Sequence, residues 1–230
     1  MELIEAISVR HAVRQYIDKP LADDVKQQLK ECISRYNAEG GLHMQLVTDD
    51  PNAFDSGLAK YGKFEGVSNY VAMICRKGCD EVLGYYGEYV VLLAQALGLN
   101  SCWVGLTFKK QPDRYVVASD EHLVCVLALG YGRTQGVPHP QKKGIEAYME
   151  DVRSEKNQPL PEWFQKGLEA ALLAPTAINQ QKFEFLLHDD NVVEPRTKFT
   201  LLSNYAAIDL GIAKCHFEIG AGRDNFRFLR

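Results

Sequence analysis

One stretch of this 230-residue chain decides how the rest is interpreted: Ala-Pro-Thr-Ala-Ile-Asn-Gln-Gln-Lys-Phe, residues 174–183. Pro175 ends a helix predicted over Pro161–Ala174, and a strand is predicted over Lys182–His188. Small side chains at this helix end would let a flat ligand approach the backbone, and Thr176 and Asn179 can donate hydrogen bonds to ring oxygens. The alternative interpretation is a plain helix-ending loop that binds nothing.

A second informative stretch lies near the start of the chain. Residues 10–14 read Arg-His-Ala-Val-Arg and follow a helix predicted over Glu2–Val9. Arg10, His11 and Arg14 thus place three potentially cationic groups within five residues, and arginine can bind a phosphate through two parallel hydrogen bonds. The alternative is a solvated basic turn that pairs with nearby carboxylates (Asp18, Asp23 and Asp24).

The chain shows weak internal repetition. Aligning Pro20 with Pro159, an offset of 139 residues, superposes similar patterns in the two halves. The matched pairs are the helices Ala22–Tyr36 and Pro161–Ala174 and the strands His43–Thr48 and Lys182–His188. The apolar helix Tyr85–Leu97 also has a counterpart at Tyr205–Ile219, at a smaller offset. Further buried strands are predicted at Tyr70–Cys75 and Leu123–Leu129. We interpret the chain as two related lobes, residues 1–145 and a shorter 146–230.

Composition excludes several classes of protein. There are 26 Lys and Arg against 30 Asp and Glu, a formal charge of −4, so nucleic acid is not an expected partner. No apolar stretch approaches the roughly 20 residues that span a bilayer, and the start lacks a signal-peptide pattern. The six cysteines lie mostly in apolar runs, which is typical of reduced thiols in a cytoplasmic protein. Cys75 and Cys79 have no second ligand pair, so no metal site is expected.

Together these segments resemble the nitroreductase-like flavoprotein family. Residues 10–14, followed by Pro20-Leu21, resemble its Arg-Arg/His-Ser-x-Arg/Lys motif, and residues 174–183 resemble its Ala-Pro-Ser-x-x-Asn-x-Gln-Pro-Trp motif. Residues 96–105 resemble its Gly-Leu-Gly-Ser-x-Trp-Ile-Gly segment. Residues 127–132 resemble its Ile-Gly-Tyr-Pro strand end, and Lys142 and Lys143 match the basic pair that follows. The resemblance implies an α+β fold with two pseudo-symmetric lobes, whose central antiparallel or mixed sheets are surrounded by helices.

The order of the motifs departs from ordinary members of that family. There the Ala-Pro-Ser segment follows the Arg motif in the same half, whereas here it comes about 160 residues later. Ordinary members are homodimers with FMN at the subunit interface, held by one subunit's Arg motif and the other's Ala-Pro-Ser loop. The resemblance therefore implies a subfamily with two lobes fused in one chain, which keeps one composite FMN site and can act as a monomer.

The resemblance also implies a role for each site residue. Arg10, Lys142 and Lys143 would neutralise the FMN phosphate, and His11 and Ala12 would meet the ribityl chain. Arg14 would lie at the N1/C2 edge, where a cation stabilises reduced flavin. The remaining contacts would come from Val104 and Gly105 near N5, and from Pro175, Thr176, Ala177 and Asn179 around the ring. Two residues depart from the family pattern: Ala12 replaces a Ser, and Val104 replaces a frequent Glu.

The implied activity is a ping-pong oxidoreductase reaction without a catalytic side chain. NADH or NADPH would reduce the flavin and leave, and a small acceptor such as a nitroaromatic or a quinone would then be reduced. The chain contains no Gly-x-Gly-x-x-Gly after a strand and no P-loop motif. Nothing places a Cys beside a His, as a thiol hydrolase would need. The rival interpretation is a flavin-binding or flavin-free relic of the fold without catalytic activity.

Overall fold

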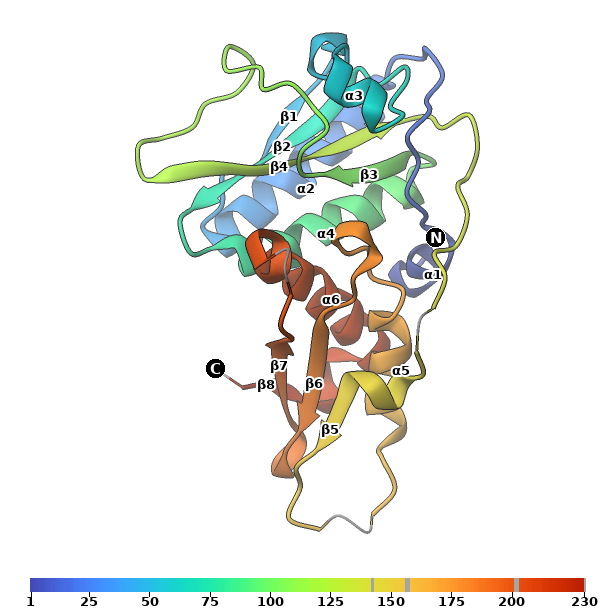
Figure 1. Ribbon diagram of the computed structural model, residues 1–230, viewed down its shortest axis with the longest axis vertical. Coiled ribbons are helices and arrows are strands. Elements are labelled where there is room, and N and C mark those ends of the chain that lie inside the picture. The colour runs from blue at the N-terminus through green and yellow to red at the C-terminus, as the bar shows by residue number, and fades with distance from the viewer. Residues whose placement is uncertain (142, 156–157, 201–202, 230) are drawn as a thin grey trace.

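The computed structural model describes residues 1–141, 143–155, 158–200 and 203–229, and it has an α+β fold. Within these ranges the chain forms six α-helices and two four-stranded sheets (Figure 1). The helices are α1 (Leu3–Val9), α2 (Asp23–Gly40), α3 (Gly57–Tyr61), α4 (Asp80–Ala96), α5 (Glu162–Ala171) and α6 (Ala206–Ala221). The two-sheet α+β architecture implied by the sequence is confirmed.

The first sheet is entirely antiparallel, in the order β1-β2-β4-β3. Its strands are β1 (Gln45–Val47), β2 (Asn69–Arg76), β3 (Asn100–Val104) and β4 (Glu121–Gly130). Alternate residues of β2 face opposite sides, as the two-residue period of a strand requires. Met73 and Cys75 pack in the core shared with α2 and α4, whereas Ala72 and Ile74 pack against residues of α3 and the neighbouring loops. Both faces of the central strand are therefore buried.

The second sheet is mixed, in the order β5-β6-β7-β8. Its strands are β5 (Met149–Asp151), β6 (Phe183–Leu187), β7 (Val192–Thr197) and β8 (Arg227–Phe228). Phe185 of β6 stacks on Phe217 of α6 with ring centroids 4.4 Å apart, and Phe217 also meets Phe164 of α5 edge-on. This aromatic group joins the second sheet to both of its helices.

Helices α4 and α6 pack against each other at the centre of the molecule, between the two sheets (Figure 1). Glycines allow their close approach. A Cβ at Gly84 would collide with the backbone of Ile208, and a Cβ at Gly211 would collide with the backbone of Glu81 and Tyr85. Helix α4 belongs to the first predicted lobe and α6 to the second, so their contact joins the two parts of the chain.

Most of the predicted elements are confirmed: they overlap α1, α2, α4, α5, α6, β1, β2, β4 and β6. Helix α3 was not predicted, nor was strand β3, whose residues 100–104 pair with β4. Strands β5, β7 and β8 were not predicted, because each is short and lacks a clear two-residue period. Helix α4 begins at Asp80, five residues before the expected start. In the described ranges, no helix is long and apolar enough to cross a membrane.

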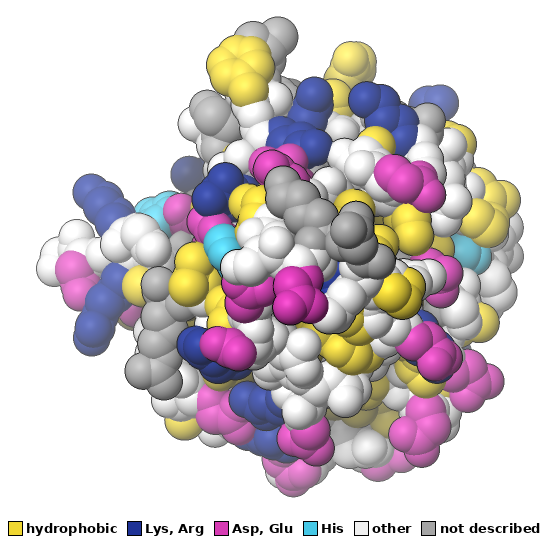
Figure 2. All heavy atoms as spheres, turned by 90° about the horizontal axis from the view of Figure 1, so that it is seen from below, with side chains coloured by type: hydrophobic (Ala, Val, Ile, Leu, Met, Phe, Trp, Pro, Cys, Tyr) yellow, Lys and Arg dark blue, Asp and Glu magenta, His cyan; other side chains and the backbone are white. Residues whose placement is uncertain are grey.

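The surface carries both signs of charge. Figure 2 views the molecule from the end that carries the second sheet, and there basic and acidic side chains lie interspersed among apolar ones. The face seen in Figure 2 therefore has no concentrated basic patch. The formal charge of the whole chain is −4.

Candidate functional site

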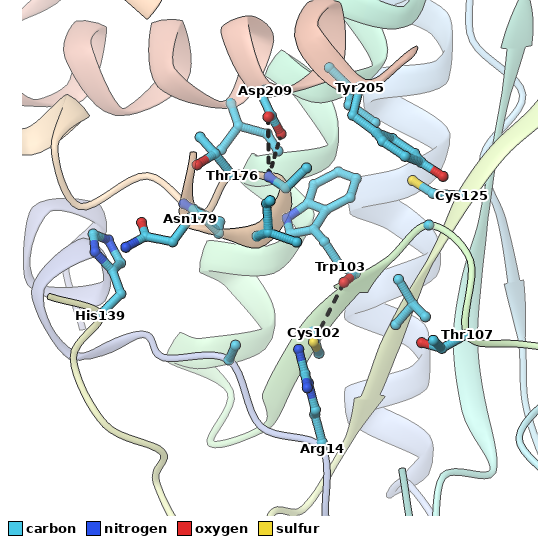
Figure 3. A pocket seen from close by; sticks show the side chains of 18 of the residues that line it. Arg14, Cys102, Trp103, Thr107, Cys125, His139, Thr176, Asn179, Tyr205 and Asp209 are labelled. Atoms are coloured by element: carbon cyan, nitrogen blue, oxygen red, sulfur yellow. Dashed lines mark hydrogen bonds between the residues drawn. The ribbon is translucent and has the colours of Figure 1, made fainter. Parts of the chain in front are cut away.

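A cavity of about 500 Å³ lies where the first sheet meets α6 and the loop that follows α5 (Figure 3). Its walls come from both predicted lobes, including Val137 and His139 near the end of the first. Ten of the twelve predicted site residues line it: Arg10, His11, Ala12, Arg14, Val104, Gly105, Pro175, Thr176, Ala177 and Asn179. The fold therefore brings residues 160 positions apart to one cavity.

The Arg motif, residues 10–14, has an extended backbone that runs alongside strand β3. It is therefore not the solvated turn of the alternative interpretation. Ala12 forms a parallel bridge with Ser101, and the Val13 amide donates to the Ser101 carbonyl. Residues 10–14 thus run along the outer edge of the first sheet. The Arg14 guanidinium lies 5.7 Å from the ring centroid of Phe64 and donates a long hydrogen bond to the Gly62 carbonyl. This arrangement points the Arg14 charge into the cavity (Figure 3).

Arg10 is the buried end of this motif, and its partner is Glu88 of α4 rather than an aspartate at the surface. The Arg10 Nε atom lies 3.7 Å from Glu88 Oε1, and both side chains are almost fully buried. Glu88 Oε2 accepts a hydrogen bond of 2.9 Å from the Trp103 indole, and Trp103 also lines the cavity. Glu88 therefore positions two cavity residues at once.

His216 of α6 completes this buried cluster. Its Nδ1 lies 3.1 Å from the Ala170 carbonyl oxygen, and its Nε2 lies 2.9 Å from Glu88 Oε1. The ring therefore links α6 to α5 and to the carboxyl group that contacts Arg10 and Trp103.

Hydrogen bonds to Asp209 of α6 hold the loop at residues 175–181, and the sequence analysis did not predict this residue. Asp209 accepts hydrogen bonds from the Ala177 amide, at 3.0 and 3.1 Å, and from the Gln180 side chain, at 2.8 Å. Burial raises the pKa of Asp209 to about 6, against the lowering effect of these hydrogen bonds. Asp209 itself lines the cavity, so the loop and its anchor form one wall.

The same loop has an unusual backbone. Ile178, Asn179 and Gln181 have φ values of 47°, 54° and 46°, in the left-handed region. Positive φ is especially unfavourable for a β-branched residue such as Ile178, whose side chain is largely exposed at the cavity. Strained backbone of this kind concentrates at functional sites, where surrounding contacts maintain it. Here the contacts to Asp209 supply part of that support.

Two of the three cations expected at a phosphate lie in the described residues: Arg10 lines the cavity, whereas Lys143 is exposed and does not. Lys142 lies outside the described residues. His139, four residues before Lys143, also lines the cavity, and its two ring nitrogens are buried without a hydrogen-bond partner in the described structure. The Asn179 side chain donates to the Pro140 carbonyl at 3.1 Å, so residues 139–140 lie against the 175–181 loop, and Figure 3 shows His139 beside Asn179.

The cavity fits a flavin mononucleotide in size and in chemistry. Its volume lies within the range of about 300–1,000 Å³ typical of small-molecule sites. Apolar walls suit a flat ring. Arg10 Nε and both nitrogens of His139 make no hydrogen bond within the described residues, so they suit the phosphate-bearing chain. A Cβ at Gly105 would lie 2.5 Å from the Tyr205 hydroxyl, so any larger residue there would displace the Tyr205 ring at the cavity.

An α+β fold of two four-stranded sheets, with a cavity between the first sheet and α6, is consistent with the fold that the resemblance implies for a nitroreductase-like protein. Residues 2–221 match a family model described as "Putative TM nitroreductase". The match covers nearly the whole chain, and the chain belongs to this nitroreductase family.

Comparison with solved structures agrees with the fold. A "putative nitroreductase" from Thermotoga maritima matches with a TM-score of 0.65 and 21% identity, over 97% of this chain and 85% of that one. Two proteins, each described as a "putative nitroreductase in complex with FMN", match at a TM-score of 0.48 and 15% identity. The Desulfovibrio desulfuricans protein is matched over 70% of this chain and 99% of its own, and the Exiguobacterium sibiricum protein over 64% and 95%. A search of curated proteins found no match.

Several site residues were missed by sequence reasoning, although some left a signal. Glu88 and Asp209 are acidic residues flanked by apolar residues in mostly apolar helices, a pattern that predicts a buried polar role. His139 gave no such signal, because it lies in a Pro- and Gly-containing segment without periodicity.

Proposed function

We propose that this chain binds one FMN in the cavity and acts as a flavin-dependent oxidoreductase. The observation that carries this proposal is the meeting of the Arg motif and the 175–181 loop in one cavity. The two segments share a site only because the lobes pack together, and each matches a flavin-binding motif of the family that the chain resembles.

Different residues of the cavity would contact different parts of FMN. Arg10, supported by Glu88 and His216, and the unpartnered His139 would hold the phosphate, with His11 and Ala12 beside the ribityl chain. Arg14 would supply a positive charge at the N1/C2 edge, and a cation there favours the reduced flavin. Small residues of the loop, Pro175 to Ala177, would leave one ring face open for a second flat molecule, and Asn179 would contact the ring edge.

The bound flavin supplies the hydride chemistry, so no side chain need act as acid or base. We propose NADH or NADPH as the reductant and a nitroaromatic or quinone as the acceptor, each using the same cavity in turn. The exposed apolar residues at the cavity, Leu106, Val137 and Ile178, would contact such flat, apolar acceptors. Substrates that share one cavity must enter alternately, which is the origin of ping-pong kinetics.

We also propose that the site is complete within one chain. Residues 1–145 contribute the Arg motif and β3, and residues 146–230 contribute the loop and α6. A fused-lobe protein of this kind needs no second copy to enclose its cofactor, so a monomer would be sufficient.

An absorbance spectrum of freshly purified protein, with and without added FMN, tests this function. We expect flavin bands that remain with the protein on gel filtration and that bleach when NADH or NADPH is added without oxygen. The absence of flavin uptake would contradict the proposal. Flavin that is retained but not reduced by either nicotinamide would instead indicate a binding protein of the relic type, consistent with Ala12 and Val104 at positions where the family pattern has polar residues.

A further inference from the structure

We infer that Cys75, Asp80 and His122 form a binding site for a zinc-like divalent metal ion, separate from the flavin cavity. The three residues come from β2, the first turn of α4 and β4, respectively. Their donor atoms, one sulfur, one oxygen and one nitrogen, all lie within 4.8 Å of one another. This site goes beyond the proposed flavin function and does not depend on it.

No sequence pattern predicts this cluster, because His122 lies 47 residues after Cys75. The ladder between β2 and β4 brings them together as directly opposed residues. The register of that ladder shifts by one residue between Met73 and Ile74, which leaves Val124 as an extra residue on β4. Without the shift Leu123 would oppose Cys75, because a one-residue slip moves each side chain to the other face. Such irregularities are concentrated near functional sites.

The geometry suits tetrahedral coordination. Cys75 Sγ lies 3.6 Å from Asp80 Oδ1. Zinc bonds of about 2.3 Å to sulfur and about 2.1 Å to oxygen would separate these atoms by about 3.6 Å at the tetrahedral angle. His122 Nε2 lies 2.8 Å from the same oxygen, a hydrogen-bond distance that must open by about half an ångström to admit the ion.

Charge, burial and access are also suitable. A thiolate and a carboxylate would balance a divalent cation, with a neutral imidazole as third ligand. Cys75 is buried, whereas the side chains of Asp80 and His122 are 26% and 34% exposed, so an ion can enter from solvent. These three side chains leave the fourth position of a tetrahedral zinc site to a solvent molecule.

The bound ion would tie the ends of two strands to the start of α4. That helix carries Glu88 and packs against α6, so the ion would stabilise the element at the centre of the fold. A metal that binds the folded chain and not the unfolded chain raises the unfolding temperature by mass action.

The test is equilibrium dialysis of chelator-treated protein against Zn²⁺, with metal analysis, alongside ¹¹³Cd NMR of the cadmium-loaded protein. We expect about one zinc per chain, an unfolding temperature raised by zinc, and a cadmium resonance in the range of mixed sulfur, nitrogen and oxygen ligands. Cys75→Ala and His122→Ala should each lose at least tenfold in zinc affinity. The matched controls Cys32→Ala and His188→Ala, at residues outside the cluster, should not.

Circular dichroism in the presence of chelator shows whether each variant is folded, and Asp80→Asn provides a further ligand variant if one fails. Wild-type protein without saturable zinc binding would overturn the inference, as would folded ligand variants that bind zinc like the controls. The cluster would then be a hydrogen-bonded group only. Flavin content is measured in the same samples, so failure of the metal site and failure of the flavin proposal are separate results.

Discussion

Asp209 and Glu88 are carboxyl side chains buried in helices whose other buried residues are mostly apolar. Burial of a carboxyl group is unfavourable unless hydrogen bonds or charges compensate it. Asp209 is compensated by the amide of Ala177 and the side chain of Gln180, and Glu88 by Arg10, Trp103 and His216. Both carboxyl groups therefore hold a cavity wall in place.

The raised pKa of Asp209 predicts a specific effect of pH on stability. In the unfolded chain this carboxyl ionises near pH 3.8, whereas in the folded chain it ionises near pH 6. Between these values the folded state holds a proton that the unfolded state has lost, so the Asp209 contribution to stability falls as pH rises. The total loss is at most about 3 kcal/mol, at about 1.4 kcal/mol for each tenfold change in acidity.

Asp209→Asn should remove this slope. In urea unfolding measured at pH values from 4 to 7, the free energy of unfolding of the variant should rise relative to wild type as pH increases. The exposed residue Asp55 provides the control, because Asp55→Asn should leave the difference from wild type constant across that range. A pH-independent difference for Asp209→Asn would mean that this carboxyl group ionises alike in both states.

Arg10 gives a prediction about stability that does not require flavin. Arg10→Ala leaves Glu88 buried without its cationic neighbour, and removing one partner of a buried pair costs about 3–5 kcal/mol. Because Trp103 and His216 still contact Glu88, we expect the low end of this range. Lys109→Ala, which removes an exposed charge, should change the free energy of unfolding by less than about 0.5 kcal/mol. Equal effects in flavin-free protein would contradict the role of the Arg10–Glu88 pair.

At this scale, sequence reasoning found the residues of the two motifs but not their partners. Arg10 was expected to face a phosphate, and the structure adds that its charge is shared with Glu88, 78 residues away. Pairings at such separations depend on tertiary packing. No local pattern near Arg10 or Lys143 shows that the first is buried and the second lies away from the cavity.

At the scale of elements, the contact between α4 and α6 depends on glycines. The Gly211 Cα faces the backbone of Glu81 and Tyr85, and the Gly84 Cα faces the backbone of Ile208. Backbone atoms cannot rotate away as side chains can, so an added methyl group must push the helices apart. Overpacking of this kind typically costs about 1–3 kcal/mol, and more where the backbone must move.

Gly211→Ala should therefore lower the free energy of unfolding by about 3 kcal/mol, even though alanine is the better helix former. Gly57→Ala is the matched control, because a Cβ there meets nothing within 4 Å. Chemical denaturation of both variants measures the effect. Stability of Gly211→Ala equal to that of the control would show that α4 and α6 are not packed this closely.

The elements also show where sequence patterns are informative. Helices α2, α4, α5 and α6 are long enough for their apolar periodicity to be clear, and all four were predicted. Strand β3 was missed because Asn100 and Ser101 interrupt its apolar pattern, although both are buried. These polar residues are accommodated by tertiary contacts: Asn100 accepts from the Gly132 amide, and the Ser101 carbonyl accepts from Val13.

At the scale of the whole molecule, the chain is built so that one cavity draws on both ends of the sequence. The division into lobes at residues 145 and 146 stays a prediction, as does descent from a duplicated ancestor. The two sheets are formed by residues 45–130 and 149–228, on either side of that division, and α4 and α6 meet between them. This packing brings two motifs that lie far apart in the sequence to the same cavity.

A self-contained site predicts a simple stoichiometry. Light scattering coupled to gel filtration should show one flavin bound per chain in the monomer, and dilution should not release flavin by dissociating an oligomer. A dimer that loses its flavin when it separates would show that a second copy contributes to the site.

We propose that FMN is held in the cavity between the Arg motif and the 175–181 loop, and titration of flavin-free protein with FMN tests this placement. Quenching of flavin fluorescence should saturate at one FMN per chain. Arg14→Ala, from the first wall, should weaken binding, and Ala177→Trp, which fills the cavity from the opposite wall, should weaken it at least tenfold. Ala118→Trp, at an exposed position outside the cavity, should bind FMN like the wild type. Equal FMN affinity in Ala177→Trp and Ala118→Trp, or no saturable binding by the wild type, would contradict the account.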